Sequence, residues 1–134
     1  MKKIDNVKCP SLLIVEDDAD IRDLMKIFLE AEGYQVSLAA DGLDALEQLQ
    51  AGARPSLILL DLMMPRMDGE QFLSEMQSRR FSQTPVVIMA GHCAVQQRAD
   101  QLKAVCCLTK PVELDELLST VRQLVPVHVK RDVA

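Results

Sequence analysis

Short runs of aliphatic residues alternate along the chain with longer amphipathic stretches. Apolar runs that lack a polar face are typical of strands in a parallel sheet covered on both sides. The predicted strands cover residues 11–15, 35–39, 56–60, 85–89 and 104–108. The pattern therefore predicts a sheet of five parallel strands.

The stretches between the predicted strands carry apolar residues at the spacing of a helix. Gly33 and Gly52 end the first two helices, because glycine tolerates the left-handed backbone that often closes a helix. The residues expected to face the core are Ile21, Leu24, Met25, Phe28 and Leu29 in the first helix and Leu43, Leu46 and Leu49 in the second.

Three further helices follow the third, fourth and fifth strands. The third should begin at Asp68, whose side chain can cap the first turn. The side chain of Gln71 can in turn accept a hydrogen bond from the backbone N–H of Asp68, which forms a capping box. The fourth, at about residues 94–102, has only a narrow apolar stripe. The last is the clearest, and Pro126 stops it. Its apolar residues are Leu114, Leu117, Leu118, Val121, Leu124 and Val125.

Five strands in strict alternation with five helices predict a doubly wound α/β domain. This domain is expected to cover residues 11–126, with tails at residues 1–10 and 127–134. Ligands of such sheets bind beyond the carboxyl ends of the strands. The chemistry should therefore lie at that edge.

Length and charge restrict the function classes. A chain of 134 residues can bury a sizeable core without disulfides or structural metals. The net charge of −5 argues against nucleic-acid binding by this chain alone. The polar residues near the start argue against a signal peptide, and no run approaches the roughly 18 apolar residues of a membrane span. We expect a cytoplasmic protein that contacts no membrane.

The four cysteines, Cys9, Cys93, Cys106 and Cys107, lack the spacing of a metal site. In a reducing cytosol they are expected to be ordinary small hydrophobic residues. Because side chains alternate along a strand, Cys106 and Cys107 should point to opposite faces of the sheet and should not pair with each other.

Ionisable residues follow three of the predicted strands. Glu16 and Asp17 follow the first, Asp61 the third and Lys110 the fifth. Three carboxylates in one crevice are costly unless a hard cation neutralises them, and Mg²⁺ suits carboxylate oxygens. Lys110 supplies a point charge suited to a phosphoryl group. The set predicts phosphoryl transfer with Asp61 as the nucleophile.

Four segments resemble, in the right order, the receiver domain of two-component response regulators. They are residues 12–22 (LLIVEDDADIR), 57–69 (LILLDLMMPRMDG), 85–89 and 109–111. The most diagnostic part is Asp61 followed by Pro65 and Asp68-Gly69. The resemblance spans residues 11 to about 125 and implies a flavodoxin-like sheet of order 2-1-3-4-5 with five helices.

The resemblance implies a role for each matching residue. Asp61 is the phosphoacceptor, Lys110 binds the phosphoryl group, and the Lys110–Pro111 peptide bond is cis. The implied Mg²⁺ ligands are Glu16, Asp17, Asp61 and the backbone carbonyl of Met63. Because the acidic pair is then complete, Asp18 is better explained as the cap of the first helix than as a ligand.

The implied partners are proteins. The phosphoryl group would come from a histidine kinase or from a phosphotransfer protein that carries phosphohistidine. The signal would pass to a downstream protein through the face formed by the fourth helix, the fifth strand and the fifth helix.

The chain departs from its relatives at two switch positions. Ala90 stands where relatives have Thr or Ser, and Cys107 where they have Tyr or Phe. In those relatives, the two positions couple phosphorylation to movement of the fourth helix. The loss of one hydrogen bond to a phosphoryl group removes roughly 1.5 to 3 kcal/mol, so Ala90 should impair switching more than phosphoryl acceptance.

Two other function classes stay open at this stage. A scaffold that works without phosphorylation is favoured by Ala90 and Cys107. A phosphohydrolase with an aspartyl-phosphate intermediate is disfavoured, because Leu62 and Met63 follow Asp61 where such enzymes have a second carboxylate. We expect a signalling phosphoacceptor and not an enzyme. Its own chemistry would be limited to self-phosphorylation from a donor and autodephosphorylation.

Overall fold

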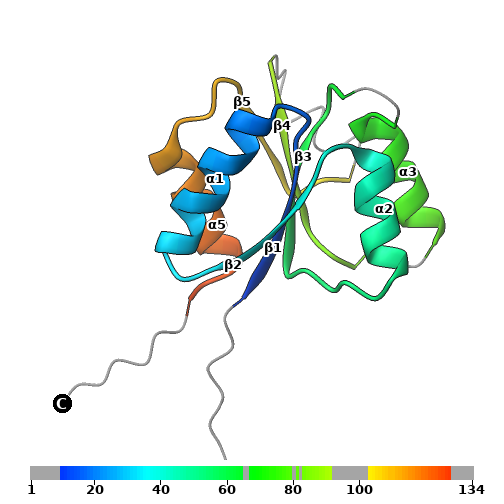
Figure 1. Ribbon diagram of the computed structural model, residues 1–134, viewed down its shortest axis with the longest axis horizontal. Coiled ribbons are helices and arrows are strands. Elements are labelled where there is room, and N and C mark those ends of the chain that lie inside the picture. Colours follow the sequence, from blue (N-terminus) through cyan, green and yellow to red (C-terminus); the bar gives the residue numbers. More distant parts are fainter. Residues whose placement is uncertain (1–9, 65–66, 80, 82, 92–102, 128–134) are drawn as a thin grey trace, which may run out of the picture.

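The computed structural model describes residues 10–64, 67–79, 81, 83–91 and 103–127. Within them, five parallel strands form one sheet in the order β2-β1-β3-β4-β5, which confirms the predicted topology (Figure 1). The first two strands have the predicted bounds, the next two lie one residue later, and the fifth starts two residues later. The strands are β1 (Ser11–Val15), β2 (Gln35–Ala39), β3 (Leu57–Asp61), β4 (Val86–Ala90) and β5 (Cys106–Thr109).

Helices cover both faces of the sheet. The structure describes α1 (Ala19–Ala31) and α5 (Leu114–Leu124) on one face, and α2 (Gly42–Gln50) and α3 (Gly69–Ser78) on the other (Figure 1). The predicted fourth helix, at residues 94–102, lies outside the described residues. No helix in the described part of the chain is both long enough and apolar enough to cross a lipid bilayer.

The core consists of two aliphatic layers, one on each side of the sheet. In β3, Leu57 and Leu59 pack toward α1 and α5, whereas Ile58 and Leu60 pack toward α2 and α3. All four side chains are 0% exposed, and each burial stabilises the fold by roughly 2 kcal/mol. The central strands thus form a rigid platform for the residues that follow them.

The two predicted side-chain caps fix where α1 and α3 begin. Asp18 is the N-cap of α1 and accepts hydrogen bonds from the backbone N–H groups of Asp20 and Ile21. Asp68 and Gln71 form the predicted capping box of α3. Both caps were predicted, and each directly adjoins the carboxyl edge of the sheet.

Three residues that were expected to face the core are exposed. Ile21 is 41% exposed, Leu24 53% and Leu43 37%. In α1 the core contact is made by Met25 and Leu29. Ile21 and Leu24 sit on the same helix but line a partly open cavity, which the segment after β5 also lines.

The end of α5 is tied to the turn between α1 and β2. The buried hydroxyl of Tyr34 donates a hydrogen bond of 2.6 Å to the carbonyl of Val125. Gly33 in the same turn has φ +103°, and a β-carbon there would lie 3.1 Å from the side chain of Val127. This contact closes the fold at the edge opposite the carboxyl ends of the strands.

The two neighbouring cysteines of β5 do point to opposite faces. Cys106 packs on the α1 and α5 side as a free thiol, and Cys107 packs on the α2 and α3 side. Cys107 is disulfide-bonded. The expectation that all four cysteines are plain hydrophobic residues was therefore wrong for Cys107, because linear spacing does not show which thiols meet in space.

Candidate functional site: an acidic cluster with a lysine

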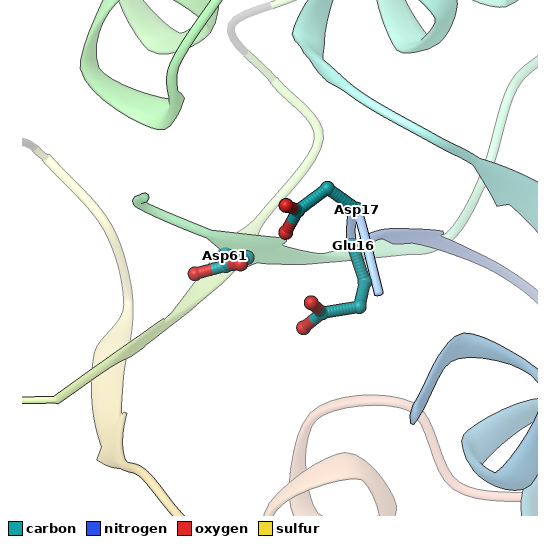
Figure 2. Close-up of side chains that lie close together, drawn as sticks. All are labelled: Glu16, Asp17 and Asp61. Atoms are coloured by element: carbon teal, nitrogen blue, oxygen red, sulfur yellow. The ribbon is translucent and has the colours of Figure 1, made fainter. Parts of the chain in front are cut away.

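Three carboxylates meet at the carboxyl edge of β1 and β3. Val15 pairs with Leu60, so Glu16 and Asp61 follow at the same level of adjacent strands. Oxygen atoms of Glu16, Asp17 and Asp61 all lie within 4.8 Å of one another. Figure 2 shows these carboxylates turned toward a common space. We call these three residues the acidic cluster.

The members of the acidic cluster differ in their contact with solvent. Glu16 and Asp61 are each 1% exposed, whereas Asp17 is exposed. Burial raises the pKa of Glu16. The hydrogen bond from the Asp18 backbone and the charge of Lys110 lower this pKa, whereas the nearby charge of Asp61 raises it further. Two buried carboxylates side by side are thus held at a cost in free energy.

Lys110 supplies the cation that offsets this cost. Its Nζ lies 3.0 Å from Oδ2 of Asp61 and 3.3 Å from Oε1 of Glu16. Burial lowers the pKa of Lys110, but the hydrogen bond and charge of Asp61, with those of Glu16, outweigh it and leave this pKa raised. The lysine therefore stays protonated at neutral pH.

Backbone geometry at the end of β5 directs Lys110 toward the acidic cluster. The Lys110–Pro111 peptide bond is cis, as expected. The Lys110 N–H donates to the carbonyl of Ala90, which continues the pairing of β5 with β4 by one residue. The chain then turns away toward α5.

A short loop after Asp61 positions its carboxylate. The Met63 N–H donates to Oδ1 of Asp61 at 3.1 Å, so Oδ1 is anchored while Oδ2 faces Lys110. The side chain of Met63 is 76% exposed and plays no part in this contact. A metal role for the Met63 carbonyl stays a prediction.

Two contacts near the site were missed by the sequence analysis. Arg22 is half-buried and donates from its guanidinium to the backbone carbonyl of Glu16 at 2.9 Å. Gly69 packs so tightly that an added β-carbon would lie 2.7 Å from the α-carbon of Leu62 and 2.9 Å from the carbonyl oxygen of Asp61. The diagnostic Asp68-Gly69 pair was a signal for the second contact, whereas nothing in the sequence indicated the first.

The two switch positions lie on β4 and β5, next to this site. Ala90 is 6% exposed and pairs with Thr109 across the strands. Cys107 pairs with Ile88. Ala90 offers a methyl group and no hydrogen-bond donor from its side chain to a ligand at the strand ends.

A cavity of about 180 Å³ adjoins the acidic cluster on the side of α1. Glu16 and Lys110 form its polar end. Its other walls are apolar and come from α1, β4, α5 and the segment after β5. They comprise Ile21, Leu24, Met25, Met89, Pro111, Val112, Leu114 and Leu117.

The fold and site belong to a known class of signalling domain. The family model of the response regulator receiver domain matches residues 12–122. Because this match covers most of the chain, the chain belongs to the receiver domain family of two-component response regulators. It resembles response regulator MprA of Mycobacterium ulcerans (strain Agy99), with 36% identity over 115 residues that cover 84% of this chain and 49% of the relative.

Solved receiver structures agree with this assignment. The receiver domain of the Francisella response regulator 1452 has a TM-score of 0.79 and 29% identity, with 86% of this chain and 95% of that chain covered. Chemotaxis response regulator CheY4 of Vibrio cholerae has a TM-score of 0.80 and 29% identity, with 88% and 100% covered. The chain spans about half the length of the curated relatives that it matches.

Proposed function

We propose that Asp61 accepts a phosphoryl group from a histidine kinase or phosphotransfer protein in a Mg²⁺-dependent reaction, and that the product signals through protein contact. The observation that carries this proposal is the placement of Asp61. Its carboxylate is buried, anchored at Oδ1 by the Met63 N–H and faced at Oδ2 by the ammonium of Lys110.

Each step of the transfer has a residue suited to it. A carboxylate oxygen of Asp61 attacks phosphorus, and the P–N bond to the imidazole of the donor breaks as the new P–O bond forms. The Nζ atom of Lys110 lies 3.0 Å from Oδ2 of Asp61, so it can bind a negatively charged oxygen of the phosphoryl group once that group is on Asp61. Hydrolysis of the acyl phosphate restores Asp61, so no turnover of another substrate is proposed.

The acidic cluster fits a hard divalent cation. Each of its three side chains offers a carboxylate oxygen as a ligand, and these oxygens lie within 4.8 Å of one another. Glu16 and Asp61 are buried and Asp17 is exposed, so a hydrated ion can enter on the side of Asp17. Glu16, Asp17, Asp61 and the Met63 carbonyl are the proposed ligands. A bound Mg²⁺ would offset the negative charge that the phosphoryl group brings to the site.

The exposed start of α1 is suited to contact with the phosphodonor. Any protein that delivers a phosphoryl group to buried Asp61 must cover the carboxyl edge of the sheet. Ile21 and Leu24 lie beside that edge, and the cavity that they line shares Glu16 and Lys110 with the site. An apolar side chain of the donor would fill this cavity.

The proposed output face includes β5 and α5. Val105, just before β5, is 44% exposed, and Asp115 and Glu116 are exposed on α5. The rest of the predicted face, at residues 94–102, lies outside the described residues. We propose a cytoplasmic location, where histidine kinases carry their phosphohistidine.

A scaffold that works without phosphorylation is the second candidate. Ala90 and Cys107 favour it, because neither side chain can act as the hydroxyl or aromatic group of the usual switch. The two candidates differ in whether Asp61 takes a phosphoryl group.

Intact mass distinguishes the two candidates. The purified chain is incubated with acetyl phosphate or phosphoramidate, with and without Mg²⁺, beside Asp61→Asn. We expect one phosphoryl adduct that requires Mg²⁺ and is absent from the variant. No adduct, together with no binding of beryllofluoride, would reject phosphoryl acceptance and favour the scaffold.

A further inference from the structure

Every polar atom of Glu16 has a partner in the structure. Its N–H donates to the carbonyl of Ala39 at 3.1 Å, which continues the pairing of β1 with β2. Its carboxylate accepts from the Asp18 N–H at 3.2 Å through Oε2 and from Nζ of Lys110 at 3.3 Å through Oε1. Its carbonyl accepts from Nη1 of Arg22 at 2.9 Å. Glu16 is thus held at both its backbone and its side chain.

Asp17 has no such anchor for its side chain. No hydrogen bond or ion pair among the described residues holds its carboxylate, which is exposed. The direction of this side chain therefore follows the backbone between Glu16 and Asp18. Asp18 is held in turn, because its Oδ1 accepts from the N–H groups of Asp20 and Ile21 at the start of α1.

The contact from Arg22 acts on the peptide bond that joins the two acidic residues. The carbonyl of Glu16 and the N–H of Asp17 belong to one planar peptide unit. A donor that fixes this carbonyl also fixes the rotation of the unit, and with it the directions in which both side chains leave the backbone. Figure 2 shows the two carboxylates turned toward the common space that they share with Asp61.

The side chain of Arg22 is suited to hold this carbonyl. An arginine guanidinium keeps its charge in proteins and offers several donors in one rigid plane. The side chain is half-buried and reaches back from the first turn of α1. The Arg22 N–H donates to the carbonyl of Asp18 at 2.9 Å. The helix that carries the guanidinium is therefore tied to the same turn that it stabilises.

We infer that Arg22 is a positioning residue that sets the affinity of the acidic cluster for Mg²⁺. It contributes no ligand and acts by holding the peptide unit between Glu16 and Asp17. Residues that orient metal ligands through hydrogen bonds commonly change metal affinity by roughly tenfold to hundredfold when they are replaced. The inference rests on the proposed function, because it takes the acidic cluster as the Mg²⁺ site.

The arginine has two effects on a bound cation, and they have opposite signs. Its positive charge repels Mg²⁺, so removal of the charge alone would tighten binding. Loss of its hydrogen bond releases the Glu16–Asp17 peptide and weakens binding. Arg22→Met keeps an apolar stem and removes both the charge and the donor. The direction of the change in affinity therefore shows which effect is larger.

Mg²⁺ binding is measured by NMR titration of the metal-free full chain, without any phosphodonor. We expect Arg22→Met to raise the Mg²⁺ dissociation constant roughly tenfold, and Arg22→Lys, which keeps the charge and a donor, to raise it about threefold. Arg122→Met is the matched control, because Arg122 is 55% exposed in the last turn of α5 and pairs with Glu32. Its dissociation constant should equal that of the wild type.

Three results of this titration would overturn the inference. They are an unchanged or lower dissociation constant in Arg22→Met, an equal increase in Arg122→Met, and a wild-type chain that binds no Mg²⁺. Urea unfolding shows which variants are folded. If Arg22→Met does not fold, the threefold increase in Arg22→Lys carries the test, and an unchanged constant in that variant would overturn the inference.

The turn itself is examined in the metal-free chain. The Asp18 amide, which donates to Glu16, should exchange with water roughly threefold or more faster in Arg22→Met than in the wild type. Equal exchange would show that Arg22 does not hold the turn. Saturating Mg²⁺ should restore the rate of phosphorylation by acetyl phosphate, and a rate that stayed low would contradict a role in affinity. Failure of the proposed function would appear separately, as a chain that binds Mg²⁺ but forms no phosphoryl adduct.

Discussion

The Nζ atom of Lys110 lies 3.0 Å from Oδ2 of Asp61, although the two residues leave the sheet from strands that are not neighbours. The lysine side chain crosses the end of β4 to reach β3, and it also lies 3.3 Å from Glu16. One ammonium thus offsets two buried carboxylates in the metal-free domain. Its removal should expose the cost of burying them.

Lys110→Met should destabilise the metal-free protein. The variant keeps the aliphatic stem but leaves Glu16 and Asp61 without their cation, so the free energy of unfolding in urea should fall by about 1 to 3 kcal/mol at pH 7. Mg²⁺ should restore part of this loss. Lys26→Met is the control, because the exposed pair of Lys26 with Glu30 contributes less than about 0.5 kcal/mol. Equal losses in both variants would show that Lys110 does not compensate the buried charges.

Glu16→Gln should stabilise the metal-free protein in a pH-dependent manner. Burial raises the pKa of Glu16 above its ordinary 4.5, so the folded state binds the proton more tightly than the unfolded state. Ionised Glu16 therefore opposes folding at neutral pH, and the amide should raise the free energy of unfolding.

The advantage of Glu16→Gln should shrink as the pH falls through the folded pKa toward 4.5, where wild-type Glu16 itself becomes protonated. Urea titrations of both proteins over this range, with metal removed by chelation, measure the difference. An advantage that stayed constant down to pH 4.5 would contradict the raised pKa.

Gly69→Ala should disturb the loop that anchors Asp61. The new methyl group would meet backbone atoms of Leu62 and Asp61 at 2.7 and 2.9 Å, and backbone atoms in a hydrogen-bonded loop cannot easily move. We expect a loss of roughly 2 kcal/mol in the free energy of unfolding and a lower rate of phosphorylation by acetyl phosphate. Gly91→Ala is the matched control, because a β-carbon there meets nothing within 4 Å. If Gly69→Ala and Gly91→Ala have the same stability and phosphorylation rate, the tight packing at Gly69 does not position Asp61.

Leu24→Glu should separate protein donors from small donors. Leu24 is 53% exposed and lines the cavity beside the site, so a charge there should hinder an apolar donor residue. Transfer from a phosphorylated histidine phosphotransfer protein that serves the wild type should fall about tenfold, or about 1.4 kcal/mol, with no change for acetyl phosphate. Ile27→Glu is the control, since Ile27 is 67% exposed on the same helix and lies outside the cavity. The same loss in both variants would argue against the cavity as the contact.

Ala90→Thr should strengthen the conformational response. The added hydroxyl can donate to the phosphoryl group, and such a bond contributes roughly 1.5 to 3 kcal/mol, or a tenfold to hundredfold larger population shift. Hydrogen exchange of β5 with and without beryllofluoride measures the shift in reduced protein. Phosphoryl acceptance should change little. An unchanged response would mean that the missing hydroxyl does not limit switching.

Most of the fold followed from local patterns whose physical cause is short-range. The β3 run is apolar on both faces because both faces are covered, and Asp18 and Asp68 follow the chemistry of helix caps. The convergence of Glu16, Asp17, Asp61 and Lys110 was predictable, because parallel strands share one carboxyl edge.

The failures concern contacts between elements that no local pattern encodes. Ile21 and Leu24 fit the periodicity of a buried helix face, yet that periodicity cannot show that part of the face borders an open cavity. The contact from Arg22 to Glu16 depends on how α1 leaves its cap. The disulfide of Cys107 depends on which thiols meet in the folded chain, which the spacing of the cysteines does not reveal.

The hydrogen bond from Tyr34 to Val125 has a practical consequence for how the protein is handled. It holds the end of α5 at the amino edge of the sheet, away from Asp61 (Figure 1). A fluorophore, affinity handle or surface linkage placed after Val127 would therefore leave from the side opposite the acidic cluster. Immobilisation through that end should leave the edge that receives the phosphoryl group open to a donor in solution.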